Sequence, residues 1–250
     1  MHLKVIACEI AARELYFTAA TCRNLVDLEL LTQGHHDRPV PGRAAIQERI
    51  DAVPEGKYDA IVLGYGLCSR LLDGLVARHT KLIAPRAHDC ITLFLGSAER
   101  YALRFSEKPG TYYYTSGWIE CAQRRGLKFS DWAGAATPAG MPAAPYEEWV
   151  RKYGEDQARY LVEEMGRWTA AYTEGTLIRF DFDHTLGLEN HVRPLCQARG
   201  WEYNEIPGDL TLLQRLLDGQ WDEFLTVLPG QRIAATHDDR VIEARPDHVL

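Results

Sequence analysis

Short apolar runs recur along the chain, and most of them are followed by a segment with helical spacing. The clearest runs are residues 3–7, 58–63 and 81–84. An unbroken apolar run is typical of a strand buried on both faces, as in a parallel sheet. Alternating strand and helix segments predict an α/β fold. We therefore expect one or more mostly parallel sheets with flanking helices, Rossmann- or flavodoxin-like, in two lobes around a cleft.

The same patterns predict the remaining elements. Further strands are expected at residues 25–31, 111–115, 176–182, 200–206 and 224–228. Helices are expected at residues 11–21, 43–53, 69–78, 88–104, 146–172, 191–199 and 210–217. The residues after 230 are polar, and we expect them to fray.

One stretch interrupts the rhythm of strand and helix. Residues 127–145 are rich in alanine, glycine and proline and have no apolar period. Such a composition indicates a flexible insertion or linker. We therefore predict an N-terminal α/β lobe at residues 1–126, a flexible insertion at 127–145 and a C-terminal α/β lobe at 146–250.

Charge and hydropathy exclude several kinds of partner. The net charge is −7 and no Lys/Arg cluster stands out, which argues against nucleic acid and anionic membrane surfaces. No apolar run approaches the roughly 20 residues that span a bilayer, and the chain has no secretory leader pattern. We expect a cytoplasmic protein, in which the six cysteines are free thiols, ligands or catalysts. No nucleotide-binding fingerprint is present.

Three of the cysteines close predicted strands. Cys8, Cys68 and Cys90 follow the runs at residues 3–7, 58–63 and 81–84. Ligands bind at the carboxyl ends of the strands in open α/β sheets. We therefore predict that these thiolates bind one metal ion at a shared sheet edge, Zn²⁺ rather than an iron–sulfur cluster. Cys22 and Cys196 lie in helix-like contexts and are interpreted as structural.

Polar residues near these strand ends complete the predicted site. His88 is the candidate fourth ligand or proton-transfer group, and Asp89 is a second catalytic candidate. The expected small-molecule contacts are Tyr65, Gly66, Arg86, Thr115, Gly117, Trp118, Asp181 and Asp183. The pair His35 and His36 lies in a turn-rich polar loop, where we expect it to be solvated.

Two other functions remain open. A metal-free binding or sensor module would use the backbone of Gly64, Gly66 and Gly117. The run from Asp181 to Leu186 resembles the Asp-x-Asp-x-Thr motif of haloacid-dehalogenase phosphatases, in which the first aspartate is the nucleophile. A phosphatase would then act through Asp181 and Asp183, but few residues remain for the other Mg²⁺ ligands. Whether the chain is an enzyme is open, and a metal-dependent transferase is one possibility.

Several motifs together resemble domain-of-unknown-function family 1638. They are Tyr65-Gly-Leu-Cys68, the run Pro85-Arg-Ala-His-Asp-Cys-Ile-Thr-Leu-Phe-Leu-Gly-Ser97, the run from Thr111 to Trp118, and residues 201–230. Members of this family are similar to proteins found beside corrinoid-dependent methyltransferases. The resemblance implies a small-molecule substrate in one-carbon or methyl-transfer metabolism, with a corrinoid methyltransferase system as a partner.

Overall fold

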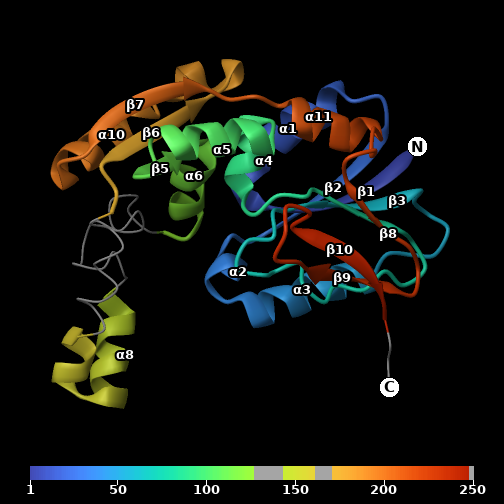
Figure 1. Ribbon diagram of the computed structural model, residues 1–250, viewed down its shortest axis with the longest axis horizontal. Coiled ribbons are helices and arrows are strands. Elements are labelled where there is room, and N and C mark those ends of the chain that lie inside the picture. Colours follow the sequence, from blue (N-terminus) through green and yellow to red (C-terminus); the bar gives the residue numbers. More distant parts are fainter. Residues whose placement is uncertain (127–142, 161–170, 248–250) are drawn as a thin grey trace. The chain divides into compact units, whose positions relative to one another are not determined.

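A computed structural model describes residues 1–126, 143–160 and 171–247 of the chain (Figure 1). The chain divides into two compact units. The first comprises Met1–Tyr101 and Asp209–Leu250, and the second comprises Ala102–Gly208. Within the described residues, no helix is both long and apolar enough to cross a membrane.

The first unit is built on a five-stranded sheet with the order β2-β1-β3-β4-β8. Its strands are β1 (His2–Cys8), β2 (Leu25–Leu31), β3 (Ala60–Gly64), β4 (Leu82–Ala84) and β8 (Leu225–Val227). The first four strands are parallel, and β8 pairs with β4 in the antiparallel sense. The predicted α/β class with a mostly parallel sheet is therefore confirmed.

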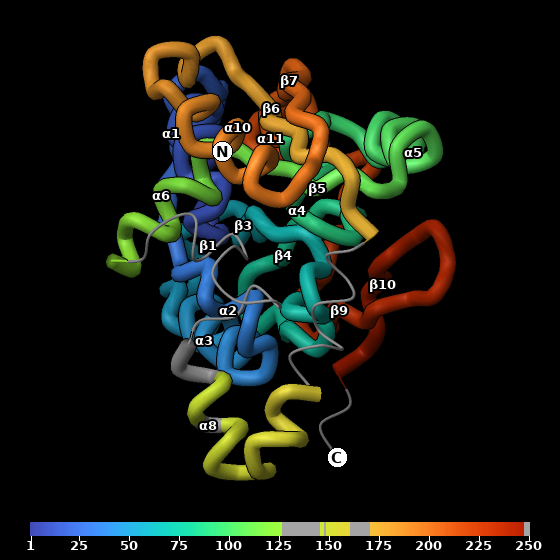
Figure 2. The backbone as a smooth tube through the Cα atoms, turned by 90° about the vertical axis from the view of Figure 1, so that its left-hand side faces the viewer, coloured from blue at the N-terminus to red at the C-terminus, as the bar shows by residue number. Residues whose placement is uncertain are grey.

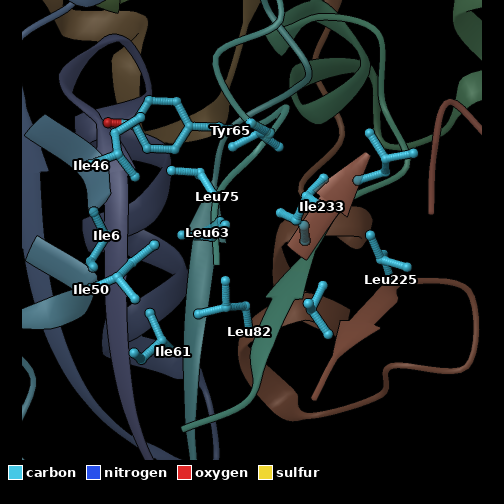
Figure 3. Close-up of a cluster of buried hydrophobic side chains, with 14 of the residues drawn as sticks. Ile6, Ile46, Ile50, Ile61, Leu63, Tyr65, Leu75, Leu82, Leu225 and Ile233 are labelled. Atoms are coloured by element: carbon cyan, nitrogen blue, oxygen red, sulfur yellow. The ribbon is translucent and has the colours of Figure 1, made fainter. Parts of the chain in front are cut away.

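Helices cover both faces of this sheet. Alternate residues of β1 point to opposite faces, so Ile6 packs against α3 (Pro39–Asp51) through Ile46 and Ile50 (Figure 3). On the other face lie α1 (Ala12–Thr21) and α11 (Thr211–Asp218), which contact each other (Figure 1). Burial on both faces explains why the strands read as continuous apolar runs.

The chain after residue 230 forms a β-hairpin. The strands β9 (Gln231–Ala235) and β10 (Ile242–Pro246) pair in the antiparallel sense (Figure 2). Their residues Ile233 and Ile242 are fully buried in the cluster that also holds Ile6. The expectation that this segment frays is wrong, because a few apolar residues among polar ones are enough to anchor it.

The expected helix at residues 69–78 is absent, because the segment after β3 is a series of turns. Cys68, Ser69 and Arg70 all have positive φ, at 37°, 54° and 64°. A left-handed backbone costs a residue other than glycine roughly 1–2 kcal/mol. Here it is held by local contacts, since Arg43 Nη2 donates to the Arg70 carbonyl at 3.0 Å and Arg70 forms a 2.7 Å ion pair with Asp73.

The expected helix at residues 88–104 is divided into two. The short α4 (Cys90–Leu95) ends at Gly96, where φ is 79°, and α5 (Ala98–Glu107) follows. A Cβ at Gly96 would lie 2.5 Å from Asp209 Cγ. The Asp209 amide also donates to the Phe94 carbonyl at 2.9 Å. Gly96 therefore supplies both the left-handed turn and the space for the chain that returns to the first unit.

The second unit contains a three-stranded parallel sheet with the order β5-β6-β7. Its strands are β5 (Thr111–Tyr114), β6 (Glu174–Arg179) and β7 (Glu202–Pro207). The helices α6 (Ser116–Arg124) and α10 (Glu189–Arg199) contribute Ile119, Val192 and Leu195 to one buried cluster with Tyr114 and Leu177. A 3₁₀ helix, η2 (Asp181–Leu186), follows β6.

The division into units differs from the expected lobes at residues 1–126 and 146–250. Strand β8 pairs with β4, and an isolated bridge joins Val76 to Arg232, so the C-terminal segment belongs to the first unit. Most of the expected insertion, residues 127–142, lies outside the described residues. Its last residues begin α8 (Ala143–Tyr153), which opens the expected long helix, and residues 161–170 lie outside the description.

Candidate functional site

The sheet order of the first unit brings the three predicted strand ends together. The strands β1, β3 and β4 are adjacent and parallel, with Ala7 opposite Gly64 and Val62 opposite Ile83. A Cβ at Gly64 would lie 2.5 Å from the Ala7 Cβ, so β1 and β3 approach closely where they end. Cys8, Cys68 and Cys90 follow these ends, and all three belong to or pack against one hydrophobic cluster.

Backbone contacts join the loop after β3 to the loop after β4. The Leu67 amide donates to the Ala87 carbonyl at 2.7 Å, and the Cys68 amide donates to the His88 carbonyl at 2.9 Å. Gly66 lies so close to Asp89 that a Cβ would be 2.6 Å from its carbonyl carbon. Because the two loops are held together in this way, the side chains of Cys68 and Cys90 lie close enough for each to shift the pKa of the other.

A histidine from a fourth strand end completes the contact. The one-turn helix α2 (Gly34–Asp37) follows β2, and His36 in it lies near the Cys68 side chain. Glu9 Oε1 accepts from the Gln33 amide at 2.9 Å, which fixes this loop to the end of β1. Although His36 is exposed, it is not merely solvated as we expected, because its ring has a specific partner.

The three contacting groups influence each other's protonation. Hydrogen bonds from Cys90 and then from His36 lower the pKa of Cys68, against the effect of burial. The hydrogen bond with Cys68, followed by burial, raises the pKa of Cys90 well above its usual range. The contact with Cys68 also raises the pKa of His36. The arrangement therefore favours a thiolate at Cys68 between a neutral Cys90 thiol and an imidazolium.

A buried tyrosine hydroxyl adds a polar group without a partner. Tyr65 is 3% exposed, and its ring lies beside Ile46 (Figure 3). Its hydroxyl has no hydrogen-bond partner among the described residues. Burial, and then the nearby Cys8 and Cys68, raise the pKa of Tyr65 above its usual range. The hydroxyl is thus a neutral donor next to the thiols, with its hydrogen-bonding capacity unused.

The donor atoms are close but are not arranged as a preformed metal centre. Within residues 1–126, 143–160 and 171–247, no three His, Cys, Asp or Glu side chains form a group ready to hold a metal ion. Cys90, Cys68 and His36 form a row of neighbouring side chains, with Cys68 in the middle. Cys8 is near enough to affect the pKa of Cys90, although its effect is smaller than that of Cys68.

The other predicted residues of this region have mainly structural contacts. Asp89 caps α4, because Oδ1 accepts from the Ile91 amide at 3.0 Å and Oδ2 accepts from the Tyr101 hydroxyl at 3.0 Å. Arg86 Nη1 donates to the carbonyls of Arg240 and Ile242 and so holds β10. The His88 side chain is exposed, and its backbone carbonyl rather than its ring contacts the cysteine loop.

Five predicted contact residues lie in the second unit. Thr115 is buried and caps α6 by accepting from the Gly117 amide at 3.2 Å, and Trp118 packs against the core of that unit. Asp181 is exposed, whereas Asp183 is fully buried. Their assignment to the substrate stays a prediction.

The Asp-x-Asp-x-Thr segment has its own set of partners. Asp183 Oδ1 accepts from Arg179 Nε at 3.0 Å, and its Oδ2 accepts from the Phe180 amide at 2.9 Å. Asp181 Oδ1 lies 3.8 Å from His184 Nε2. The second aspartate, which would be the general acid of a phosphatase, is therefore used to close the turn after β6.

Sequence reasoning missed His36 as a member of the site, and it named Tyr65 as a small-molecule contact without predicting that its hydroxyl is buried and unpaired. A signal for the histidine was present, because His36 follows the strand at residues 25–31 as the cysteines follow theirs. Treating all parallel strand ends alike would have selected it. The unpaired state of the Tyr65 hydroxyl depends on packing by α3, which the sequence does not display.

The chain was compared with protein families, curated proteins and solved structures. Residues 30–217 match a family described as "Protein of unknown function (DUF1638)". No curated protein and no solved structure matches the chain. The match covers more than half of the chain and includes Cys68, Cys90 and His36, while Cys8 precedes it. The chain belongs to this family, as its motifs predicted.

Proposed function

We propose that the reduced protein binds one metal ion, Zn²⁺ in preference to an iron–sulfur cluster, through Cys68, Cys90 and His36, with Cys8 as the fourth ligand. The observation that supports this most directly is the row of neighbouring side chains Cys90, Cys68 and His36 beside Cys8. Thiolates and imidazole are the ligands that Zn²⁺ prefers. His36 replaces His88 as the proposed nitrogen ligand, because His36 interacts with Cys68 whereas no contact of the His88 ring with the thiols is described.

Metal binding requires only local rearrangement. Zn–S bonds of about 2.3 Å and Zn–N bonds of about 2.0–2.1 Å need the donors to surround one point. The four donor atoms would surround one point if the side chains of Cys8 and His36 turned toward Cys68 and Cys90. Cys90 must lose its proton in this step, and metal binding supplies the energy for that loss.

A metal at this edge would act on a small molecule. Zn²⁺ supplies Lewis-acid chemistry, which activates a bound thiol or water. The neutral Tyr65 hydroxyl would donate to a group held beside the thiols. The family resemblance adds a role in methyl transfer, as a transferase or as an accessory protein of a corrinoid methyltransferase system. A reducing cytoplasm belongs to the proposal, because the ligands must stay thiols.

The metal-free binding module has less support. It would need glycines that free the backbone for a ligand, but Gly64 and Gly66 are required by the close approach of Ala7 and Asp89. Packing already accounts for these glycines. The phosphatase also stays a prediction, and the contacts of Asp183 with Arg179 and Phe180 do not favour it.

Competition with a chromophoric chelator, under anaerobic conditions and without a histidine tag, tests the proposal. The reduced protein should take up one equivalent of Zn²⁺. His36→Ala should weaken binding, whereas His35→Ala in the same one-turn helix should not. In the same way Cys90→Ser should weaken binding and Cys22→Ser should not, because Cys22 hydrogen-bonds to backbone carbonyls away from the row. Equal binding by all four variants would overturn the proposal.

A further inference from the structure

The contact between Cys68 and Cys90 has a second chemical consequence, which does not require a metal. The two sulfur-bearing side chains are neighbours, and both belong to or pack against one hydrophobic cluster. They come from loops that are already joined by two backbone hydrogen bonds, Leu67 to Ala87 and Cys68 to His88. We propose that Cys68 and Cys90 form a disulfide when the protein meets a hydroperoxide, and that this oxidation disables the metal site.

The surroundings favour oxidation of Cys68 and Cys90 over oxidation of the cysteines elsewhere in the chain. Cys121 and Cys196 are buried in the second unit, where Cys196 donates to the Gly175 carbonyl at 3.8 Å. Cys22 donates to the carbonyls of Ala19 and Asn24. Cys90 is partly exposed, whereas Cys68 is buried. A small oxidant can therefore reach Cys90 first, with Cys68 in place to react next.

The reaction balances with the hydroperoxide as the only oxidant. The proton of Cys90 first passes to the neighbouring Cys68 thiolate, and the resulting Cys90 thiolate attacks the terminal peroxide oxygen. The O–O bond breaks, which gives a sulfenic acid on Cys90 and an alkoxide, or hydroxide from hydrogen peroxide, that takes a proton from solvent to become an alcohol or water. The Cys68 sulfur then attacks the Cys90 sulfur. The S–S bond forms and the S–O bond breaks, and the Cys68 proton leaves with the hydroxyl as water. The two thiols lose two electrons in total, and the peroxide gains them.

The geometry of the loops limits the movement that the bond requires. A disulfide needs an S–S distance of about 2.05 Å and Cα atoms usually within about 7 Å. The close approach of Gly66 to Asp89 already brings the two loops together. Forming the bond therefore draws together side chains on two adjoining loops, and it leaves the paired strands β3 and β4 in place. The oxidised pair offers no thiolate, so two of the four proposed metal ligands are lost at once.

Disulfide mapping of the metal-free protein tests this inference independently of metal binding. Reduced protein is treated with hydrogen peroxide, the remaining thiols are alkylated, and proteolytic peptides are identified by mass spectrometry. We expect a Cys68–Cys90 crosslink that an added dithiol reverses, unchanged in Cys22→Ser and absent in Cys90→Ser. Crosslinks that join Cys8 to either cysteine instead, or sulfinic acid on Cys90 without a disulfide, would overturn it.

A second arm separates this inference from the proposed function. Zinc-loaded protein should release its metal in proportion to the disulfide formed, which a chelating dye reports. If the crosslink forms in protein that never binds zinc, the inference stands as thiol chemistry and the metal proposal fails. If zinc is bound and peroxide removes it without any Cys68–Cys90 crosslink, the metal proposal stands and the inference fails.

Discussion

The parallel strands of the two main sheets differ in the groups that lie at their carboxyl ends. In the first sheet, soft and weakly solvated groups meet there, and the buried Tyr65 hydroxyl has no partner among the described residues. In the second sheet, Asp183 is equally buried, but each of its oxygens has a partner, Arg179 or the Phe180 amide. At the same topological position, the first sheet keeps a buried hydroxyl with unused bonding capacity, and we call this position the open edge. The second sheet is closed there by internal contacts, and we call this position the closed edge.

Desolvation explains this difference. A buried carboxylate without partners is very costly, so Asp183 persists only with its ion pair and backbone hydrogen bond. A thiol behaves as a small hydrophobe and costs little to bury. Cysteines can thus line a strand end without closing it, and they keep their bonding capacity for a metal or for each other. The predictions below test this contrast, beginning with the largest expected effect.

Removing the Arg179 partner of Asp183 at the closed edge should reduce the free energy of unfolding more than any other change. Arg179→Met leaves Asp183 buried without its guanidinium partner, and truncating one member of a buried pair costs about 3–5 kcal/mol. Denaturant unfolding followed by a signal from the second unit should show this loss. Asp181→Asn is the matched control, since Asp181 is exposed and should change stability by less than about 0.5 kcal/mol. Equal effects of the two changes would show that Asp183 is not held by this pair.

At the open edge, a substitution of a proposed ligand should affect zinc binding rather than folding. Cys90→Ser should reduce zinc affinity by more than about 100-fold, because loss of a ligand exceeds the 10–100-fold effects of outer-shell changes. The free energy of unfolding of the metal-free protein should shift by less than about 1 kcal/mol, since Cys90 is partly exposed. Chelator competition and denaturant unfolding measure the two quantities. If Cys90→Ser greatly reduced stability and left the zinc affinity unchanged, Cys90 would have a structural role and not a ligand-binding one.

Tyr65→Phe tests whether the hydroxyl is unsatisfied. Removing a buried polar group without a partner should leave the metal-free protein as stable as before, or stabilise it by about 1 kcal/mol. If zinc or a substrate uses the hydroxyl, the same variant should bind that ligand more weakly. Thermal unfolding with and without zinc reports both effects. A destabilised metal-free variant would mean that the hydroxyl already has a structural partner.

The smallest expected effect concerns Glu174, which lies at the amino end of the second sheet and contributes to the pH dependence of stability. Burial raises the pKa of Glu174, but hydrogen bonds from Lys108 and Thr176 outweigh it, and the net pKa lies below its usual value of 4.5. A depressed pKa stabilises the fold above the unfolded value, and this stability is lost as the pH falls through the folded value. Unfolding between about pH 5 and pH 3 should therefore be less pH-dependent in Glu174→Gln than in the parent. The exposed Glu107→Gln should retain the parent's dependence.

Sequence patterns were sufficient for the parts of the fold that local physics determines. The strand at residues 25–31 agrees in both bounds with β2, and the apolar runs correctly predicted β1, β3 and β4. The errors occur where tertiary contacts decide the structure. The turns at residues 68–74 depend on Arg43 and Asp73, and the terminal hairpin depends on the burial of Ile233 and Ile242.

The candidate site was predictable to a similar extent. Alignment of strand ends predicted that Cys8, Cys68 and Cys90 follow neighbouring strands, and the sheet order agrees. The sequence could not indicate which of them touch, because that depends on how Gly66 packs against Asp89. It also favoured His88 over His36, because proximity along the chain is visible in a sequence and proximity in space is not.

X-ray absorption spectroscopy of the zinc-loaded, reduced, tag-free protein tests the central claim most directly. The metal shell reports its own ligands, so the result does not depend on how a substitution affects folding. We predict sulfur neighbours at about 2.3 Å together with one imidazole nitrogen at about 2.0–2.1 Å, and loss of the imidazole signal in His36→Ala. A shell of oxygen and nitrogen atoms without sulfur would contradict the account, because it would place the metal away from Cys68 and Cys90.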